Sequence, residues 1–385
     1  MIPHSLCRLC RAHSADSREH LFQSAIGGRL QVEGVLCKGC NARMGTSVDA
    51  DLAEALGFVR MLLAVEGDRG QTASIPATDK SGRKLMLRPG GLAEGVETRP
   101  NIVNLDEDTS NWTANSFRQA RQIVEAGQRK RPGDVLNVVQ ARVLKTFAEP
   151  ATVPFSFGGD AFFRAAVKTV LVFLAYMGLE GDDDALVGAW RYVDGAAAGD
   201  CDVSAHLSAT PAPWEDEGVG PVPHRVSIES VATGAIVLAQ VRYFGDLAIC
   251  IKLGVPLRAS FRVGYGVDPF TGASVERGTW EGSLALPGQA SSEAIRDAVG
   301  RAFTRITTAA EPRRVGALKE KVTSDITREV LGGRTELASD AQRRIIEARV
   351  QEEMAFIANH EDREEDSPKL REALQAAAHK VRSSS

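Results

Sequence analysis

The chain has 385 residues, which is more than one typical hydrophobic core holds and predicts two or three domains. Its composition, with 43% hydrophobic and 25% charged residues, is that of a soluble globular protein. The formal net charge of -4 excludes a surface that is basic throughout, as in histone-like proteins, so nucleic-acid contacts must come from local clusters.

We expect neither a membrane span nor a secretion signal. The longest apolar stretch, at residues 165–177, is interrupted by Lys168 and is too short to cross a bilayer. The chain begins Met-Ile-Pro-His-Ser, without the basic segment and apolar run of a signal peptide. Four of the six cysteines form paired C-x-x-C motifs, which favours metal ligation over disulfides and predicts a cytoplasmic location.

The first of these motifs is Cys7-Arg-Leu-Cys10, and the second, Cys37-Lys-Gly-Cys40, follows after 26 residues. Two thiolates at i and i+3 on a tight turn can share one tetrahedral ion with a second such pair. Four thiolates leave no open position, so the predicted Zn²⁺ is structural, and its binding energy replaces a core that so short a unit lacks. His4 and His13 are alternative ligands, but four available thiols make them surface residues in our interpretation.

Between the motifs lie Glu19 and His20, and Asn41 directly follows the second motif. A neutral imidazole near pH 7 is a suitable general base for activating water. The oxygens of Glu19 and Asn41 suit a weakly held Mg²⁺ that keeps several waters and binds phosphate oxygens. Adjacent side chains on an extended strand point to opposite faces, so both residues of the Glu-His pair serve one cleft only on a bent or bulged strand.

A helix is predicted over residues 48–65. Leu52, Leu56, Val59 and Leu63 recur at helical spacing and should pack on the cysteine unit. Before them, Thr46-Ser-Val-Asp49 resembles a capping box with Asp in place of the commoner Glu.

The middle of the chain has weaker signals. Residues 71–105 are rich in Pro and Gly and contain short strand patterns such as Lys84–Leu87. Phe117–Gln128 is predicted to be a helix. Seven basic and two acidic residues lie between Arg118 and Lys145, and the run Arg129–Arg131 is either a phosphate contact or a solvated helix end.

The second half of the chain predicts an antiparallel sheet over residues 225–285, with a turn at Tyr243–Asp246. A buried helix at residues 161–177, capped by Asp160, should pack against this sheet. Residues 195–223 suit a surface loop. A charged helical region follows, including a helix capped by Ser339, and composition predicts disorder from residue 361. The remaining candidates show no ligand spacing: Asp182–Asp184, Cys201, Cys250, His206 and His224.

The order of motifs resembles the four-cysteine subgroup of the HNH endonucleases. That pattern runs C-x-x-C, (E/D)-H-(I/L)-x-P, G-G and C-x-x-C-N-x-x-x-G. It matches this chain over about residues 1–65, including Gly27-Gly28 and Gly45. Two positions depart from it: Gln23 stands where the family has Pro, and Gly34 stands near the place of a middle Asn that orients the His.

The resemblance implies a fold and a chemistry. We expect an α+β protein in which a small zinc-stapled ββα-metal (HNH) domain precedes a larger α+β domain with an antiparallel sheet and a helical, partly disordered C-terminus. The expected divisions are 1–70 (HNH domain), 71–150 (β-rich linker and basic helical segment), 151–300 (α+β domain), 301–360 (helical segment) and 361–385 (disordered tail).

The activity implied is hydrolysis of phosphodiester bonds, with DNA as the expected substrate. By resemblance, His20 is the general base, while Glu19 and Asn41 hold Mg²⁺ or Mn²⁺ at the scissile phosphate. An HNH unit cuts one strand at a time, so double-strand breaks would need a homodimer or repeated nicking. The basic residues near this site slightly outnumber the acidic ones: Arg11, Arg18, Arg29, Lys38 and Arg43 against Asp16, Glu19 and Glu33.

Two alternatives stay open. The first is a non-catalytic zinc-stapled module that binds nucleic acid or protein. The second is an HNH effector gated by a ligand-sensing C-terminal domain, as in anti-phage defence, with an unidentified activating ligand or partner.

Overall fold

The computed structural model describes most of residues 6–358 and short stretches beyond them. The longer gaps are at 96–100, 105–109, 114–116, 132–141, 146–150, 154–156, 180–183, 215–219, 232–235, 256–259, 332–338, 359–362, 367–371 and 377–385, with shorter ones elsewhere. Contacts divide the chain into two compact units. The first contains residues 1–75, 88–92 and 154–317, and the second contains 76–87, 93–153 and 318–385.

The first unit begins with the N-terminal segment, by which we mean residues 6–65. Its elements are β1 (Arg18–His20), η1 (Ser24–Ile26), β2 (Gln31–Glu33), α1 (Lys38–Thr46), α2 (Val48–Ala55) and α3 (Gly57–Leu62). Strands β1 and β2 are antiparallel, with Glu19 opposite Val32 and His20 opposite Gln31. The segment therefore contains the two strands and the helix of the expected ββα arrangement.

The helix predicted over residues 48–65 is present as two shorter helices, which meet at Leu56 where the backbone leaves the helical region (φ -93°, ψ 6°). The four apolar residues that predicted it, Leu52, Leu56, Val59 and Leu63, are all fully buried. The predicted capping box is wrong. The hydroxyls of Thr46 and Ser47 donate back to carbonyls of α1, and the carboxylate of Asp49 binds other side chains.

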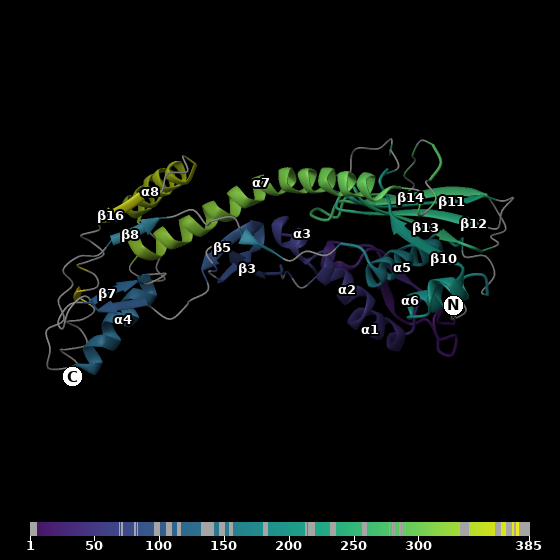
Figure 1. Ribbon diagram of the computed structural model, residues 1–385, viewed down its shortest axis with the longest axis horizontal. Helices are drawn as coiled ribbons and strands as arrows, with labels where there is room; N and C mark the ends of the chain where they lie inside the picture. Colours follow the sequence, from purple (N-terminus) through teal and green to yellow (C-terminus); the bar gives the residue numbers. More distant parts are fainter. Residues whose placement is uncertain are drawn as a thin grey trace. The chain divides into compact units, whose positions relative to one another are not determined.

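The larger part of the first unit is a six-stranded antiparallel sheet (Figure 1). Its strands, in spatial order, are β10 (Val203–Leu207), β13 (Leu247–Leu253), β12 (Ile236–Tyr243), β11 (His224–Val231), β14 (Phe261–Val267) and β15 (Ser274–Val275). The predicted turn between Tyr243 and Leu247 connects β12 to β13. The loop expected over 195–223 instead contains η3 (Ala198–Cys201) and the edge strand β10, whose partner β13 lies far along the chain and gave no local signal.

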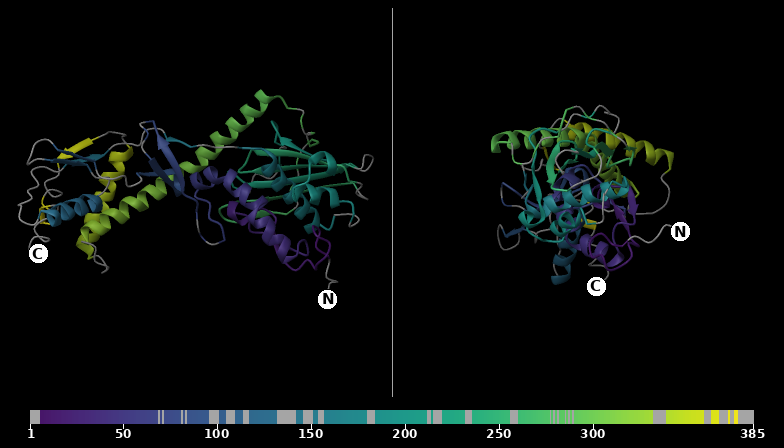
Figure 2. Two further views of the ribbon diagram at one scale, coloured as in Figure 1. Left: turned by 60° about the horizontal axis from the view of Figure 1, so that its bottom comes forward. Right: turned by 90° about the vertical axis from the view of Figure 1, so that its right-hand side faces the viewer.

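Helix α5 (Asp160–Tyr176) packs against this sheet, and α6 (Val187–Val193) packs against α5 (Figures 1 and 2). The helix agrees with the predicted range. Its predicted cap does not: Gly159 is the N-cap, and Asp160 lies in the first turn, where its carboxylate binds Arg164. Helix α2 also packs on α5, so α5 contacts both the sheet and the N-terminal segment.

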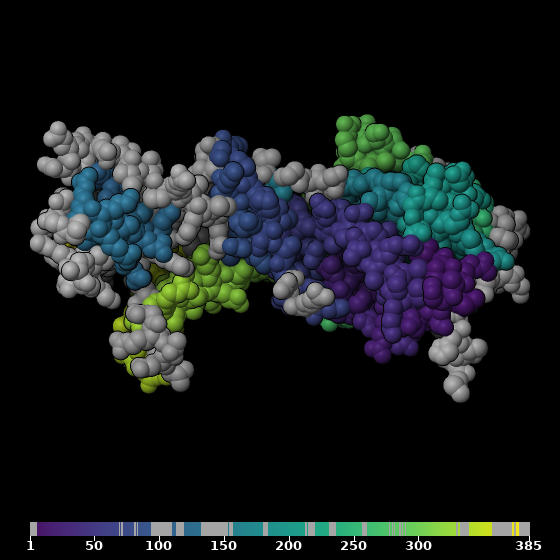
Figure 3. Space-filling view, turned by 90° about the horizontal axis from the view of Figure 1, so that it is seen from below, coloured from purple at the N-terminus to yellow at the C-terminus, as the bar shows by residue number. Residues whose placement is uncertain are grey.

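The hydrophobic core is continuous from the N-terminal segment to the sheet. Phe22, which follows the Glu-His pair closely, stacks on His224 of β11 and makes an edge contact with Tyr243 of β12. The sequence-based division placed residues 1–70 and 151–300 in separate domains, whereas their contacts place them in one unit. Figure 3 shows part of the N-terminal segment at the surface of that unit.

The second unit consists of smaller sheets and helices. A four-stranded sheet has the order β5 (Leu92–Gly95), β4 (Lys84–Arg88), β3 (Ile75–Asp79) and β9 (Ala151–Thr152). The other elements are the pair β6 (Asn101–Asn104) and β7 (Ser110–Thr113), helix α4 (Phe117–Lys130), the pair β8 (Arg142–Lys145) and β16 (Arg363–Asp366), and helix α8 (Asp340–Ala358). Strand β16 differs from the disorder predicted there, because its partner β8 is distant in sequence; most of the tail lies outside the described residues.

Helix α7 (Ser292–Val330) contributes residues to both units, and its last turns pack on α8 through Val322, Ile326, Ile346 and Val350. Ser339 caps α8 as predicted, because its hydroxyl accepts from the backbone N–H of Gln342. The fold class is α+β with antiparallel sheets and a helical C-terminal region, as the sequence predicts.

Candidate metal centres and catalytic residues

The four predicted zinc ligands form one group, the cysteine cluster (Cys7, Cys10, Cys37 and Cys40). Their sulfur atoms all lie within 4.8 Å of one another, and the Sγ atoms of Cys10 and Cys37 are 3.9 Å apart. Bonds of about 2.3 Å to a tetrahedral Zn²⁺ place its sulfur ligands about 3.8 Å apart. The described residues contain no other group of three or more His, Cys, Asp or Glu side chains that converge in this way.

Local backbone turns hold this cluster. The N–H of Arg11 donates to the carbonyl of Cys7, which closes the first turn, and Cys37 is the N-cap of α1, with its sulfur accepting from the N–H of Cys40. The backbone N–H of Arg8 donates to the carbonyl of Val35, which ties the two turns together. The ligands are thus positioned by contacts within the first forty or so residues.

The thiols of this cluster differ in their acidity. The backbone N–H of Ala12 and the side chain of His13 lower the pKa of the Cys10 thiol to about 5. Burial raises the pKa of the Cys40 thiol. A thiolate at Cys10 is therefore formed readily, whereas ionisation of Cys40 needs a compensating cation such as the metal itself.

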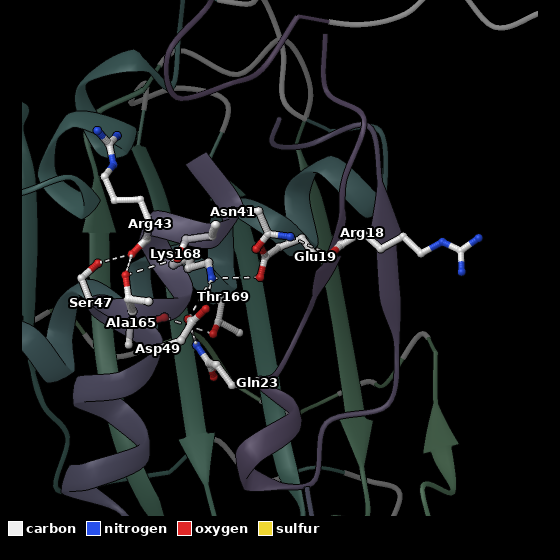
Figure 4. A network of polar contacts seen from close by, with 12 residues as sticks. Arg18, Glu19, Gln23, Asn41, Arg43, Ser47, Asp49, Ala165, Lys168 and Thr169 are labelled. Atoms are coloured by element: carbon white, nitrogen blue, oxygen red, sulfur yellow. Dashed lines mark hydrogen bonds and ion pairs between the residues drawn. The ribbon is translucent and has the colours of Figure 1, made fainter. Parts of the chain in front are cut away.

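Asn41 connects α1 to the strand that carries Glu19 and His20. Its Nδ2 donates to the backbone carbonyl of Arg18 across 2.8 Å. This bond leaves the amide oxygen of Asn41 as an acceptor, and Figure 4 shows the amide beside the carboxylate of Glu19. The expectation that the second cysteine motif brings Asn41 towards the strand agrees with this placement.

Glu19 points into the protein and is 3% exposed. Its Oε1 lies 2.9 Å from the Nζ of Lys168 on α5, while its Oε2 is buried and has no hydrogen-bond partner among the described residues. Burial raises the pKa of this carboxyl, and the lysine opposes that shift. Glu19 therefore has one oxygen in an ion pair and one that lacks a donor or cation.

His20 follows Glu19 on β1 and is partly buried, and the charges of Asp49 and Lys168, the residues around Glu19, also act on its pKa. Its Nε2 lies 3.1 Å from a carboxylate oxygen of Asp68 and 3.2 Å from the amide nitrogen of Gln31. Burial lowers the pKa of His20, against the opposing charge of Asp68, so the imidazole is neutral at pH 7. In the tautomer that carries its proton on Nε2, directed to Asp68, the neutral ring keeps the lone pair of Nδ1.

The two departures from the motif have structural roles. Gln23 is buried, and its Nε2 donates to Asp49. Gly34 has a φ of 78°, a left-handed conformation that Gly or Asn adopts most easily. The conformation of this position suits Gly, which has no side chain with which to orient His20.

The two adjacent glycines of the motif are required because a side chain at either position would clash with the backbone. Gly27 has a φ of 94°, and a Cβ atom there would lie 2.4 Å from the carbonyl oxygen of Pro269, in the turn between β14 and β15. A Cβ at Gly28 would lie 1.7 Å from the carbonyl oxygen of Phe22. Both positions need Gly for the close approach of chains. Nothing described lies within 4 Å of a Cβ at Gly45, so this motif position has no steric role in the described structure.

Sequence reasoning missed three residues of the site: Asp49, Asp68 and Lys168. Lys168 was noticed only as an interruption in an apolar stretch, and Asp49 only as a capping residue. A charged residue in the middle of a buried helix is the signal that could have found Lys168, because a buried lysine requires a partner. Other candidates have structural partners: Asp184 pairs with Arg11, and His224 bonds to the backbone.

Comparison with known proteins gives one match. The family described as HNH endonuclease matches residues 7–56, which contain the cysteine cluster, the Glu-His pair and α1. The resemblance inferred from the sequence is confirmed over these residues. Neither the curated proteins nor the solved structures include a match to the chain. Among the described helices, none combines the length and apolar character that a membrane crossing needs.

Proposed function

We propose that this protein is a metal-dependent endonuclease that hydrolyses phosphodiester bonds in DNA. The observation that carries the proposal is the match of residues 7–56 to the HNH endonucleases, within which Asn41 is bonded to the strand carrying Glu19 and His20. The family match supports a nuclease in general; the roles of single residues, the catalytic metal and DNA as substrate are our inference.

His20 is the proposed general base. Its neutral imidazole can take a proton from water at Nδ1, and Asp68 then stabilises the imidazolium through Nε2. Asp68 would orient His20 as the Asp of a hydrolytic triad orients its His, although the Asp68 side chain is 43% exposed. Arg29, which also pairs with Asp68 across 3.3 Å, keeps that carboxylate in place.

Glu19 and Asn41 are the proposed ligands of Mg²⁺ or Mn²⁺. The unpartnered Oε2 of Glu19 and the amide oxygen of Asn41 are hard donors, and an orphaned buried oxygen fits a cation ligand. When bound, the ion would supply positive charge to the phosphate and lower the cost of charge developing there. The protein's own part is to hold both oxygens in fixed positions on β1 and α1.

The cysteine cluster has a different role in this proposal. Four thiolates suit Zn²⁺ and leave no position for substrate, so the ion stabilises the fold. The turns that it crosslinks place α1, and hence Asn41, against β1.

The predicted basic surface is largely paired. Arg18 bonds to Glu33, Arg29 to Asp68, Lys38 to Asp16 and Arg43 to Asp194. Exposed pairs of this kind contribute little to stability, about 0–1 kcal/mol, so a DNA phosphate can take the place of the acid. Contacts to phosphate of this type would make DNA binding weaken with added salt.

Incubation of the full-length, zinc-loaded protein with plasmid DNA tests the proposal. With Mg²⁺ or Mn²⁺ we expect nicked or linear DNA, and with EDTA intact plasmid. Binding without cleavage in a mobility-shift assay under all metal conditions would instead support the non-catalytic module. The pairing of Lys168 with Glu19 is the observation that favours a restrained or inactive site, and it leads to the inference below.

A further inference from the structure

We infer that Lys168 competes with the divalent ion for Glu19, so that helix α5 restrains the metal site of the N-terminal segment. The inference rests on the proposed function, because it takes Glu19 as a metal ligand. Lys168 lies outside the matched region, 119 positions along the chain from Asp49, and sets the affinity of that site for the divalent ion.

Lys168 lies near the middle of α5 and is 1% exposed. Its ammonium is bonded on two sides. It lies 2.9 Å from Oε1 of Glu19, and 2.6 and 2.8 Å from the two carboxylate oxygens of Asp49 (Figure 4). We call these three residues the ion cluster. Gln23 completes its surroundings by donating to Asp49 across 3.1 Å.

A buried cluster of this kind is poor evidence for a role in stability alone. Removing three charged groups from water carries a large desolvation penalty, and well-packed apolar side chains often replace such groups without loss. The neighbours of Lys168 on α5 are apolar residues that are fully buried, including Val167, Val170 and Leu171. Apolar side chains in place of all three residues could fill similar volume, so the charges themselves call for an explanation.

The ion cluster is also electrically incomplete. Two carboxylates face one ammonium, which leaves one negative charge when all three groups are ionised. Oε2 of Glu19 and Oε1 of Gln23 are both buried without a hydrogen-bond partner in the described part of the chain. Oε2 of Glu19 is a hard acceptor, and a second cation beside it would satisfy it.

Two cations on one carboxylate oppose each other. A divalent ion bound to Oε2 of Glu19 would lie close to the ammonium at Oε1, and like charges at such short range repel strongly away from water. The ammonium therefore weakens the binding of metal at Glu19. Asp49 limits this effect, because the ammonium of Lys168 is shared between Asp49 and Glu19.

The position of Lys168 on α5 links the metal affinity of Glu19 to the rest of the first unit. Helix α5 packs on the six-stranded sheet and on α2, so its position depends on parts of the chain outside the HNH match. A displacement of α5 that moves the ammonium away from Glu19 would raise the metal affinity of the N-terminal segment. The site is thus linked to the larger part of the first unit by the contact between Lys168 and Glu19.

The test is the affinity of the full-length, zinc-loaded protein for Mn²⁺ alone, measured by electron paramagnetic resonance. Lys168→Met should bind Mn²⁺ at least about tenfold more tightly than the wild type, because the repelling charge is gone. Asp49→Asn should bind more weakly, because the lysine then interacts with Glu19 alone. Glu19→Gln should abolish Mn²⁺ binding both in the wild type and in Lys168→Met.

Thr169→Val is the matched control, since it removes a buried polar group from the next position of α5 without changing charge. It should leave the affinity unchanged. Equal or weaker Mn²⁺ binding by a folded Lys168→Met protein would overturn the inference. Should that variant not fold, Lys168→Met combined with Asp49→Asn decides: tighter binding than by Asp49→Asn alone supports the inference, and equal or weaker binding overturns it. Wild-type binding that Glu19→Gln does not affect would contradict the proposed metal site as well.

Discussion

The cysteine cluster and the Glu-His pair lie in the same N-terminal segment, yet different parts of the chain hold them. The backbone bonds that close the cysteine turns, made by Arg8 and Arg11, have both partners within the first forty or so positions. Glu19, by contrast, is held by Lys168 of α5, and His20 by Asp68, which follows α3. The candidate zinc site is thus largely encoded locally, whereas the neighbouring candidate catalytic site depends on the rest of the unit.

Loss of the zinc should have the largest effect. Cys37→Ser removes a ligand that also caps α1, so we expect loss of zinc and unfolding of the N-terminal segment. Structural zinc binding contributes about 10–16 kcal/mol in small zinc domains. Zinc content and circular dichroism measure the effect. Cys201→Ser, which changes a buried thiol outside the cluster, should keep the metal, and equal zinc loss in both variants would contradict the assignment.

The ion cluster should show the next largest effect. Lys168→Met leaves Glu19 and Asp49 buried without their cation, and breaking a buried ion pair in this way costs about 3–5 kcal/mol of unfolding free energy. Urea denaturation at pH 7 measures it. Combining the change with Glu19→Gln and Asp49→Asn should recover most of the loss, because no unpaired charge then remains. A single variant as stable as the wild type would show that the contacts are not formed in solution.

A third prediction concerns pH and the interface between the N-terminal segment and the sheet. His224 donates through Nε2 to the carbonyl of Ile26 and accepts at Nδ1 from the N–H of Phe244, an arrangement that only the neutral ring provides. Its complete burial lowers its pKa to about 4. The unfolded chain, with an ordinary imidazole, binds the proton first as pH falls.

Stability should therefore be unaffected by this group above pH 6.5 and fall by about 3 kcal/mol between pH 6.5 and 4. Thermal unfolding across this range measures the slope. His224→Gln cannot titrate and should lose this part of the slope, although its stability at pH 7 is lower. The same slope in both proteins would assign the effect to other groups.

The smallest effect is expected at the surface of β1. Arg18 and Glu33 form a cross-strand pair at 3.0 Å, but their side chains are 70% and 72% exposed. Arg18→Ala should change stability by less than about 1 kcal/mol. Asn41→Ala, which removes the side-chain bond to the backbone carbonyl of Arg18, should lower the stability by more. The reverse order would mean that the strand is held by charge rather than by α1.

Features governed by local spacing were predictable from the sequence. The cysteine motifs gave the cluster, the periodic apolar residues from Leu52 to Leu63 gave a buried helical face, and alternation gave the antiparallel sheet. Edge strand β10 and strand β16 were missed because each pairs with a strand distant in sequence.

The candidate site was predictable in its residue types but not in its contacts. The strand placement of Glu19 and His20 and the proximity of Asn41 agree with the motif. No local sequence pattern indicated that Asp49 pairs with Lys168 instead of capping a helix, or that Asp68 contacts His20. Such partners are set by how α5 and the segment after α3 pack on the N-terminal segment, and that packing is a property of the whole unit.

The most direct measurement compares metal-dependent DNA cleavage by the wild type and His20→Ala. Both proteins are first shown to contain equal zinc, and His206→Ala, which changes an exposed histidine on β10, is the matched control. We predict cleavage by the wild type and the control with Mg²⁺ or Mn²⁺, and a rate about 10²–10⁴ lower for His20→Ala. Cleavage by His20→Ala at the wild-type rate would contradict the role of His20 as general base.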